Sequence, residues 1–200
     1  PAAASATMYL DQKGEVVRGL NLNGPLAAGV PGSVAGMWAV QKRFGRLSWP
    51  DVMAPAIRLA KNGFEAYATA KPSSDPQRIN FNDYFGGKMV QGQLFKQPEL
   101  AATLQRISDK GPSEFYSGIT ADLLVAQMNR TGGLITHKDL ADYTVAWRDP
   151  LAISWNDYTI YTAPPPSSGG LGIEQLLGMK GVLAGEFASA PLNSAQYVHL

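Results

Sequence analysis

Apolar residues recur three and four positions apart over the first two thirds of the chain, and they alternate with polar residues after residue 141. The first spacing predicts amphipathic helices, because residues three and four apart share one helix face. Helices are predicted to begin at Ser33, Ser48 and Pro98, and a single helical turn is predicted at Pro112. A longer helix then runs through Leu123, Leu124 and Met128 and ends at Gly132-Gly133, and a short helix follows over 138–141. Pro55 is expected to kink the second helix or divide it into two pieces. Residues 66–97 lack this spacing and are predicted to form loops with short turns.

Residues that favour helix capping precede several of these segments. Ser33 and Ser48 are predicted to cap the first two helices, and Gly36 is expected to allow close packing of the first. Thr136 and Asp139 have the spacing of a capping box, with aspartate in place of the usual glutamate. These signals predict where the helices start.

Alternating apolar positions predict strands toward the end of the chain. They are Tyr143, Val145 and Trp147, then Leu151, Ile153 and Trp155, then the run at 158–162. The fold class is therefore predicted to be α+β. A mainly helical segment at about 31–141 precedes strands, a proline-rich loop and a helix at about 142–184. Near the start, residues 8–17 are expected to form a hairpin that turns at Asp11 to Gly14.

The run Pro-Pro-Pro-Ser-Ser-Gly-Gly at 164–170 lies between the last predicted strand and a predicted helix. Proline lacks an N–H and fixes φ, so three in a row are expected to leave the sheet in an extended form. Ser167 and Ser168 can cap the helix, and Gly169 and Gly170 are expected to absorb the turn with positive φ. These four residues are the candidates for lining or bracing a binding site. The alternative is that the loop only ends the strand.

Composition narrows the classes of function. The chain is 45% hydrophobic and 16% charged with a formal net charge of +1, which gives no basic surface for nucleic acid. No apolar run approaches the roughly 20 residues of a membrane-spanning helix. The absence of cysteine excludes disulfides, thiol catalysis and cysteine-based zinc sites, and the two histidines, His137 and His199, are far apart. No metal and no cofactor are therefore expected.

Single charged and aromatic side chains have structural interpretations. Glu114 is expected to be a solvated charge in a first helical turn, so that its replacement by alanine is nearly silent, and Asp139 is expected to be a cap. Large aromatic side chains are more often core or half-buried anchors than ligand contacts. This is the expectation for Trp49, Phe115, Trp147 and Trp155.

Five sequence blocks occur in a fixed order along the chain. They are Gly29-x-Pro-Gly-Ser-Val-Ala-Gly36, Trp49 to Gly63 with Pro-Ala-Ile-Arg-Leu-Ala at 55–60, Gly-Pro-Ser-Glu-Phe-Tyr-Ser-Gly at 111–118, Gly-Gly-Leu-Ile-Thr-His-Lys-Asp-Leu-Ala-Asp-Tyr at 132–143, and the loop at 164–170. Together they resemble the large subunit of the gamma-glutamyltranspeptidase family over roughly residues 28–170. One such block is a weak signal, whereas five in the right order are specific. The segment 66–97 matches poorly.

The resemblance implies an N-terminal-nucleophile hydrolase with a four-layer αββα sandwich, of which this chain is an internal fragment of the large subunit. In that family the precursor cleaves itself, and the new N-terminal threonine of the small subunit attacks with its own α-amine as the base. The implied reaction transfers the γ-glutamyl group of glutathione-like donors to water or to an amino acid through an acyl-enzyme. The implied partners are a small-molecule γ-glutamyl substrate and the small subunit of the same precursor, in the periplasm or outside the cell.

The resemblance places the catalytic centre outside these 200 residues. The nucleophilic threonine is expected well beyond Leu200, and the arginine that binds the substrate α-carboxylate is expected just before Pro1, in an Arg-Glu-x-Ala-Pro segment. The fragment alone is therefore predicted to be inactive, with no catalytic residue of its own. Relatives of the same fold that act as cephalosporin or glutaryl acylases or on poly-γ-glutamate remain alternatives. A non-catalytic binding module is the alternative from another class.

Overall fold

A computed structural model describes residues 1–76 and 78–200, which form two compact units. Unit 1 is Pro1–Val145 and unit 2 is Ala146–Leu200. Unit 1 is mostly helical, whereas unit 2 combines a two-stranded sheet with helices. The chain is therefore α+β, as the sequence predicts.

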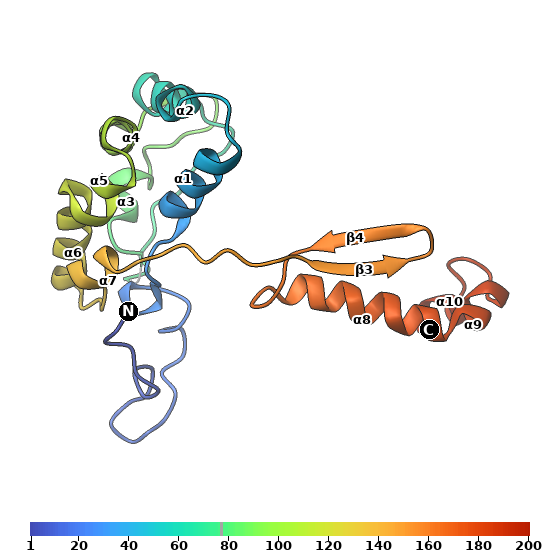
Figure 1. The fold of residues 1–200 in the computed structure, drawn as a ribbon. Coiled ribbons are helices and arrows are strands. Elements are labelled where there is room, and N and C mark those ends of the chain that lie inside the picture. Colours follow the sequence, from blue (N-terminus) through green and yellow to red (C-terminus); the bar gives the residue numbers. More distant parts are fainter. Residues whose placement is uncertain (77) are drawn as a thin grey trace. The chain divides into compact units, whose positions relative to one another are not determined.

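Unit 1 is built from helices that follow the predicted segments closely (Figure 1). They are η1 (Pro25–Ala27), α1 (Ser33–Phe44), α2 (Trp49–Asn62), α3 (Phe81–Tyr84), α4 (Pro98–Lys110), α5 (Pro112–Ser117), α6 (Ile119–Thr131) and α7 (His137–Ala141). Two short strands, β1 (Phe64–Glu65) and β2 (Leu94–Phe95), pair antiparallel. Between them the described residues are mostly turns and loops, as predicted for 66–97, but α3 and β2 lie in that range and were not predicted.

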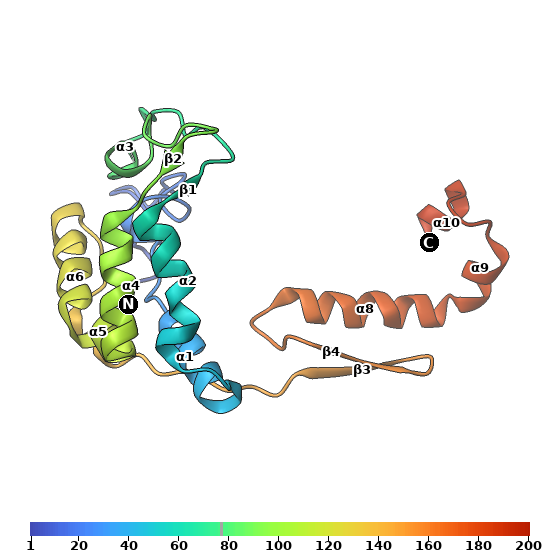
Figure 2. The same cartoon turned by 90° about the horizontal axis from the view of Figure 1, so that it is seen from above.

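The core of unit 1 lies where α5, α6 and α7 meet. Its buried members are Tyr116, Ala121, Val125, Ile135 and Leu140, and residues of α1 pack against them. A second contact joins α2 to α4, which lie side by side (Figure 2). There the indole N–H of Trp49 donates to the carbonyl of Ile107 at 3.1 Å, and the ring of Trp38 meets Trp49 edge-on at 5.1 Å. Trp49 is thus the half-buried anchor that its size predicts.

Two of the capping predictions are confirmed. Ser48 caps α2, because its hydroxyl accepts a hydrogen bond from the N–H of Asp51 at 3.3 Å. Thr136 and Asp139 form the capping box at the start of α7, with both reciprocal bonds present. Aspartate therefore replaces glutamate in the box without loss of either bond.

The predictions for the first two helices need three corrections. Gly32 holds the N-cap position of α1, and Ser33 follows as the first helical residue without a side-chain cap bond. Gly36 does not mediate close packing, since no atom lies within 4 Å of the place its Cβ would take. Helix α2 continues through Pro55 as one element, so the predicted alternative of a division into two pieces is wrong. The missing N–H leaves a single carbonyl without its helical partner, which the rest of the helix tolerates.

The predicted hairpin near the start of unit 1 is present in a minimal form. Leu10 and Val16 form an isolated antiparallel bridge. The carboxylate of Asp11 accepts hydrogen bonds from two backbone N–H groups in the turn, including that of Glu15 at 2.9 Å. Gly14 completes the turn with a φ of +82°, a conformation that glycine adopts without a Cβ clash.

Unit 2 contains the hairpin that the alternation at 151–162 predicts. Its elements are β3 (Leu151–Trp155), β4 (Tyr158–Thr162), α8 (Ser168–Val182), α9 (Ala184–Ser189) and α10 (Ala195–His199). The strands are antiparallel, with Trp155 opposite Tyr158, and Asn156 makes the turn with a φ of 49°. Helix α8 packs against β3, where Ile153 is buried and Trp155 is half-buried. Within the described residues, neither outer edge of this hairpin pairs with another strand.

The strand predicted around Tyr143, Val145 and Trp147 is absent. Residues 143–150 have no regular secondary structure. Alternation yields a strand only where a second strand supplies the hydrogen bonds, and none does so among the described residues. Tyr143 packs on the core of unit 1 instead. Trp147 is 52% exposed, so its predicted role as an anchor is wrong for this structure, whereas Phe115 is half-buried as expected.

Candidate functional site

The proline-rich loop connects β4 to α8 by a tight turn rather than by the predicted extended exit. The N–H of Ser167 donates to the carbonyl of Pro164 at 3.1 Å, and the peptide bond between Pro165 and Pro166 is cis. Helix α8 begins at the next residue, Ser168. The loop therefore reverses the chain so that the helix lies back along the hairpin.

The four predicted site residues divide into an exposed group and a buried one. Ser167, Ser168 and Gly169 are exposed, whereas Gly170 is buried. Ser167 holds the N-cap position, as predicted, but its side chain makes no cap hydrogen bond. The first turn of α8 contains no acidic residue. No acidic side chain therefore offsets the partial positive charge of the N–H groups in this turn.

Gly170 is required by packing and not by backbone conformation, which corrects the prediction of positive φ. Both glycines lie inside α8, and neither has φ in the left-handed region. A Cβ on Gly170 would overlap the carbonyl oxygen of Ala163 and approach the side chain of Thr162 to 3.0 Å. At Gly169 the nearest such atom is the hydroxyl of Ser167, at 3.8 Å. Only Gly170 therefore permits the close approach of α8 to the end of β4.

Glu114 forms a buried charge cluster that the sequence analysis missed. It is 3% exposed, and its Oε1 accepts a hydrogen bond from Arg106 Nε at 3.0 Å. The same oxygen accepts from the N–H and the hydroxyl of Thr120 at 3.2 and 3.3 Å. The ammonium of Lys110 lies 3.8 Å from Oε2. The cluster joins the ends of α4, α5 and α6, so the prediction of a solvated charge is wrong.

The ionisation of Glu114 follows from these contacts. Burial alone would raise its pKa, but the hydrogen bonds from Arg106 and Thr120 and the charge of Lys110 hold the pKa below its usual value. Arg106 and Lys110 are four residues apart in α4, but Glu114 lies beyond the helix break at Gly111, in α5. Side chains four residues apart meet only within one helix, so the sequence pattern did not predict this cluster.

Tyr116 and Tyr143 hold the glycine-rich block at the start of α1. The hydroxyl of Tyr116 donates to the carbonyl of Pro31 at 2.8 Å and accepts from the N–H of Ala35 at 3.2 Å. Its ring stacks on that of Tyr143 at 5.6 Å, and burial raises the pKa of Tyr116. A Cβ on Gly32 would overlap the phenol group of Tyr143. Gly32 is therefore the residue in this block that close packing requires.

Asp139 binds two separate parts of the chain with its two carboxylate oxygens. Oδ2 accepts from the N–H and hydroxyl of Thr136 at 2.9 and 2.6 Å. Oδ1 accepts from the N–H of Ala2, 137 residues away, at 2.6 Å. The hydrogen bonds from Thr136 and then from Ala2 lower the pKa of Asp139 from 3.8 to about 2. The predicted cap is confirmed, and the contact to Ala2 is an addition that no local pattern could indicate.

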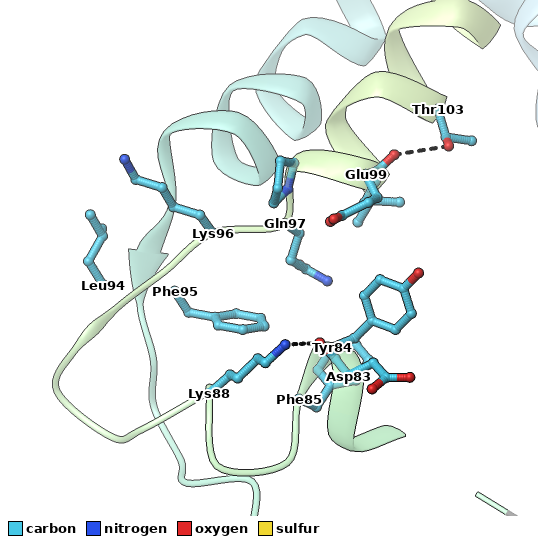
Figure 3. Close-up of a pocket in the computed structure, with 12 residues that line it drawn as sticks. Asp83, Tyr84, Phe85, Lys88, Leu94, Phe95, Lys96, Gln97, Glu99 and Thr103 are labelled. Atoms are coloured by element: carbon cyan, nitrogen blue, oxygen red, sulfur yellow. Dashed lines mark hydrogen bonds between the residues drawn. The ribbon is translucent and has the colours of Figure 1, made fainter. Parts of the chain in front are cut away.

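A pocket of ≈ 700 Å³ opens beside α3, β2 and the start of α4 (Figure 3). Its lining combines aromatic side chains with two lysines and two carboxylates: Tyr84, Phe85, Phe95, Lys88, Lys96, Asp83 and Glu99. The amide of Gln97 points into the space between Phe95 and Tyr84. The pocket contains none of the predicted site residues.

Two kinds of feature are absent from the part of the chain that the structure describes. No three His, Asp or Glu side chains gather there in a group that could hold a metal ion. His137 instead pairs with Asp122 at 2.8 Å on the surface. No helix in the same part has the length and apolar character to cross a membrane.

The comparisons with known proteins agree on one family. The sequence profile of gamma-glutamyltranspeptidase matches residues 1–200. The glutathione hydrolase proenzyme of Pseudomonas aeruginosa is 54% identical over 206 residues, which cover 100% of this chain and 37% of that protein. This chain thus spans little more than a third of the length of that curated relative.

Solved structures give the same result. The gamma-glutamyltranspeptidase from Pseudomonas nitroreducens, complexed with L-DON, is 50% identical and superimposes with a TM-score of 0.90. It is matched over 100% of this chain and 61% of that one. The Helicobacter pylori gamma-glutamyltranspeptidase is 34% identical, with a TM-score of 0.85 over 100% of this chain and 59% of that one. Both likenesses cover the helical unit and the hairpin unit alike.

Proposed function

Because the chain belongs to the gamma-glutamyltranspeptidase family, we propose that the protein containing it transfers or hydrolyses the γ-glutamyl group of glutathione-like donors. The observation that carries this proposal is the family match over all 200 residues, including each of the five sequence blocks. The reaction passes through an acyl-enzyme on a threonine outside this chain. The threonine begins a small subunit that self-cleavage of the precursor releases, and its α-amine serves as the base.

The contribution of these 200 residues is to shape and support the site. The arginine that binds the substrate α-carboxylate lies just upstream of Pro1, so the first residues of the chain lead directly out of the donor site. Ser167, at the N-cap of α8, and Ser168, Gly169 and Gly170, in its first turn, line or brace the site. The start of α8, which has no side-chain cap bond and no acidic residue, supports this role, because helix N-termini favour negatively charged groups.

Unit 2 contributes one part of a four-layer αββα sandwich. In support, β3 and β4 have unpaired outer edges in the described residues, and edges of this kind are normally paired or covered. Helix α8 has apolar residues on several faces: Leu176, Met179 and Val182 are exposed although its other side packs on β3. A helix that is apolar all round is typically buried on more than one side. The remaining strands and helices of the sandwich would cover these surfaces.

The protein works in the periplasm or outside the cell, by analogy with the family. Hydrolysis of an acyl group by a cephalosporin or glutaryl acylase, and action on poly-γ-glutamate, are the other activities that the same scaffold can support. Each would use the same nucleophile with a differently shaped substrate pocket. A non-catalytic role would require that the nucleophile be missing from the whole protein.

A direct assay tests the proposal. We expect the whole protein to mature into two chains and to release the chromophore from a chromogenic γ-glutamyl anilide, faster when a dipeptide acceptor is added. The 200-residue chain alone should give no turnover above buffer. Turnover of a glutaryl or cephalosporin substrate in preference to the γ-glutamyl anilide would favour the acylase alternative. Turnover by the 200-residue chain that scales with protein would contradict the placement of the catalytic centre outside it.

A further inference from the structure

Asp139 accepts more hydrogen bonds than a helix cap requires. A capping box needs a single oxygen of its acidic residue, and Asp139 supplies Oδ2 for this purpose at 2.6 and 2.9 Å from Thr136. Its second oxygen, Oδ1, is occupied by the N–H of Ala2 at 2.6 Å. Charge-assisted bonds of this length are among the stronger hydrogen bonds in proteins. The cap therefore also fixes the start of this chain to α7.

The contact is specific in its geometry. Asp139 lies in the first turn of a short helix whose next residue, Leu140, is completely buried in the core of unit 1. The backbone of the helix is therefore held in place, and the backbone N–H of Thr136 orients the carboxylate from one side at 2.9 Å. A rigid acceptor that bonds a backbone N–H fixes where the chain lies at that point. The N–H of Ala2 is presented by the turn in which the N–H of Ala4 donates to the carbonyl of Pro1 at 3.1 Å.

We propose that Asp139 is a positioning residue that holds the segment around Ala2, and through it the donor-binding residues immediately upstream, in the register needed to bind a γ-glutamyl substrate. This rests on the proposed function in one respect, which is the placement of the substrate α-carboxylate site just before Pro1. Asp139 does not touch the substrate. It acts through the backbone, so its loss should weaken substrate binding more than it slows the chemical step.

Three single substitutions in the whole protein separate this role from simple capping. Asp139→Asn is isosteric but has one carbonyl oxygen. The two donors of Thr136 hold that oxygen in the capping box, so the amide NH2 faces the N–H of Ala2 and the bond to Ala2 is lost. Ala2→Pro removes the N–H donor and leaves the capping box intact. Thr136→Val removes the capping hydroxyl and leaves the bond from Asp139 to Ala2 in place. Self-cleavage, the melting temperature, kcat and KM for a chromogenic γ-glutamyl anilide are measured on each.

We expect Asp139→Asn and Ala2→Pro each to raise KM about tenfold with kcat within about twofold, and the double variant to be no worse than the more affected single one. Thr136→Val should lower the melting temperature and leave KM within about twofold. The inference is overturned if KM is unchanged in both Asp139→Asn and Ala2→Pro, or if Thr136→Val raises KM equally. It is also overturned if only the proline variant has an effect, or if the two effects add. If Asp139→Asn does not mature, Ala2→Pro alone decides.

A structural measurement keeps this inference separate from the proposed function. Hydrogen exchange of the peptide that contains Ala2 should be faster in Asp139→Asn than in the unaltered protein, and unchanged in Thr136→Val. If the unaltered protein does not act on γ-glutamyl substrates, the proposed function fails, and with it the link to substrate binding. If the protein is active and exchange at Ala2 does not respond to Asp139→Asn, only the inference about Asp139 fails.

Discussion

The two units of the chain differ in how many of their apolar side chains are buried. Among the buried hydrophobic residues that the structure describes, Ile153 and Ala190 belong to unit 2, and all the others, including Leu140, belong to unit 1. In α8, Leu176 is 63% exposed and Val182 is 86% exposed. Unit 1 therefore has a hydrophobic core of its own, although it too exposes large apolar side chains such as Phe44. Unit 2 buries few apolar residues by itself, as expected for part of a larger structure such as the proposed sandwich.

Polar interactions show the same difference. In unit 1 the charged side chains of Glu114 and Asp139 each join segments that are separate in the sequence. In unit 2 the contact between α8 and the end of β4 depends on a close steric fit, where Gly170 meets the carbonyl of Ala163. Substitutions in unit 1 should therefore act through charge and hydrogen bonding. Substitutions in unit 2 should act through steric overlap.

The largest effect is expected from Glu114→Ala. The substitution leaves the guanidinium of Arg106 and the hydroxyl of Thr120 without their shared acceptor in a buried site. We expect the melting temperature of unit 1 to fall by several degrees. Glu99→Ala is the matched control, because Glu99 is also a first-turn glutamate but is exposed, and it should change little. Melting temperatures are measured by circular dichroism. Equal values for the two variants would contradict the buried, hydrogen-bonded role assigned to Glu114.

The same pair of residues shows what the sequence could predict in unit 1 and what it could not. Local patterns determined the helices, and the capping box of Thr136 and Asp139 was predicted in full because its bonds are three residues apart. The burial of Glu114 depends on Thr120 and Arg106, which come from two other helices. Tertiary contacts of this kind decide whether a first-turn glutamate is solvated or buried. No periodicity reports them.

In unit 2 the limits of prediction concern pairing and space. The alternation at 151–162 was correctly interpreted, because β3 and β4 lie close together in the sequence and supply each other's hydrogen bonds. The equal alternation at 143–147 has no such neighbour and forms no strand. Among the candidate site residues, Gly170 was chosen for a backbone freedom that it does not use. Its actual requirement, the nearby carbonyl of Ala163, is visible only in three dimensions.

A comparison of adjacent glycines tests the steric account of unit 2. Gly170→Ala should destabilise the contact between α8 and β4 by about 1–3 kcal/mol, because the new Cβ overlaps the carbonyl of Ala163. Gly169→Ala has open space and a better helix former, so it should be neutral or stabilising by at most about 1 kcal/mol. Chemical denaturation of the whole protein, followed by hydrogen exchange in residues 151–182, measures both. Equal behaviour of the two variants would contradict the role assigned to Gly170.

A second glycine pair brings the same test to unit 1. Gly32→Ala forces a Cβ against the phenol of Tyr143, but a side chain can move more readily than the backbone carbonyl at Gly170. We therefore expect a smaller loss, about 1 kcal/mol. Gly36→Ala should instead stabilise α1 by roughly 0.5–1 kcal/mol, because its surroundings are open and alanine loses less entropy in a helix. If Gly32→Ala were as harmless as Gly36→Ala, the packing of Tyr143 on this block would be refuted.

The smallest effect concerns pH and again separates the units, because both carboxylates with a lowered pKa, Glu114 and Asp139, lie in unit 1. The pKa of Asp139 falls from 3.8 to about 2 on folding, so its ionised form stabilises the folded chain fully above the unfolded pKa. That stabilisation is lost as the pH falls from 3.8 through about 2.

Part of the acid-induced decrease in melting temperature should therefore be missing in Asp139→Asn, which carries no titrating group at this position. The matched control is Asp142→Asn, which breaks only the exposed pair with Lys138 one turn away. Thermal unfolding at a series of pH values across this window measures the difference. Parallel curves of melting temperature against pH for the unaltered protein and Asp139→Asn would show that the bonds from Thr136 and Ala2 do not hold the carboxylate ionised.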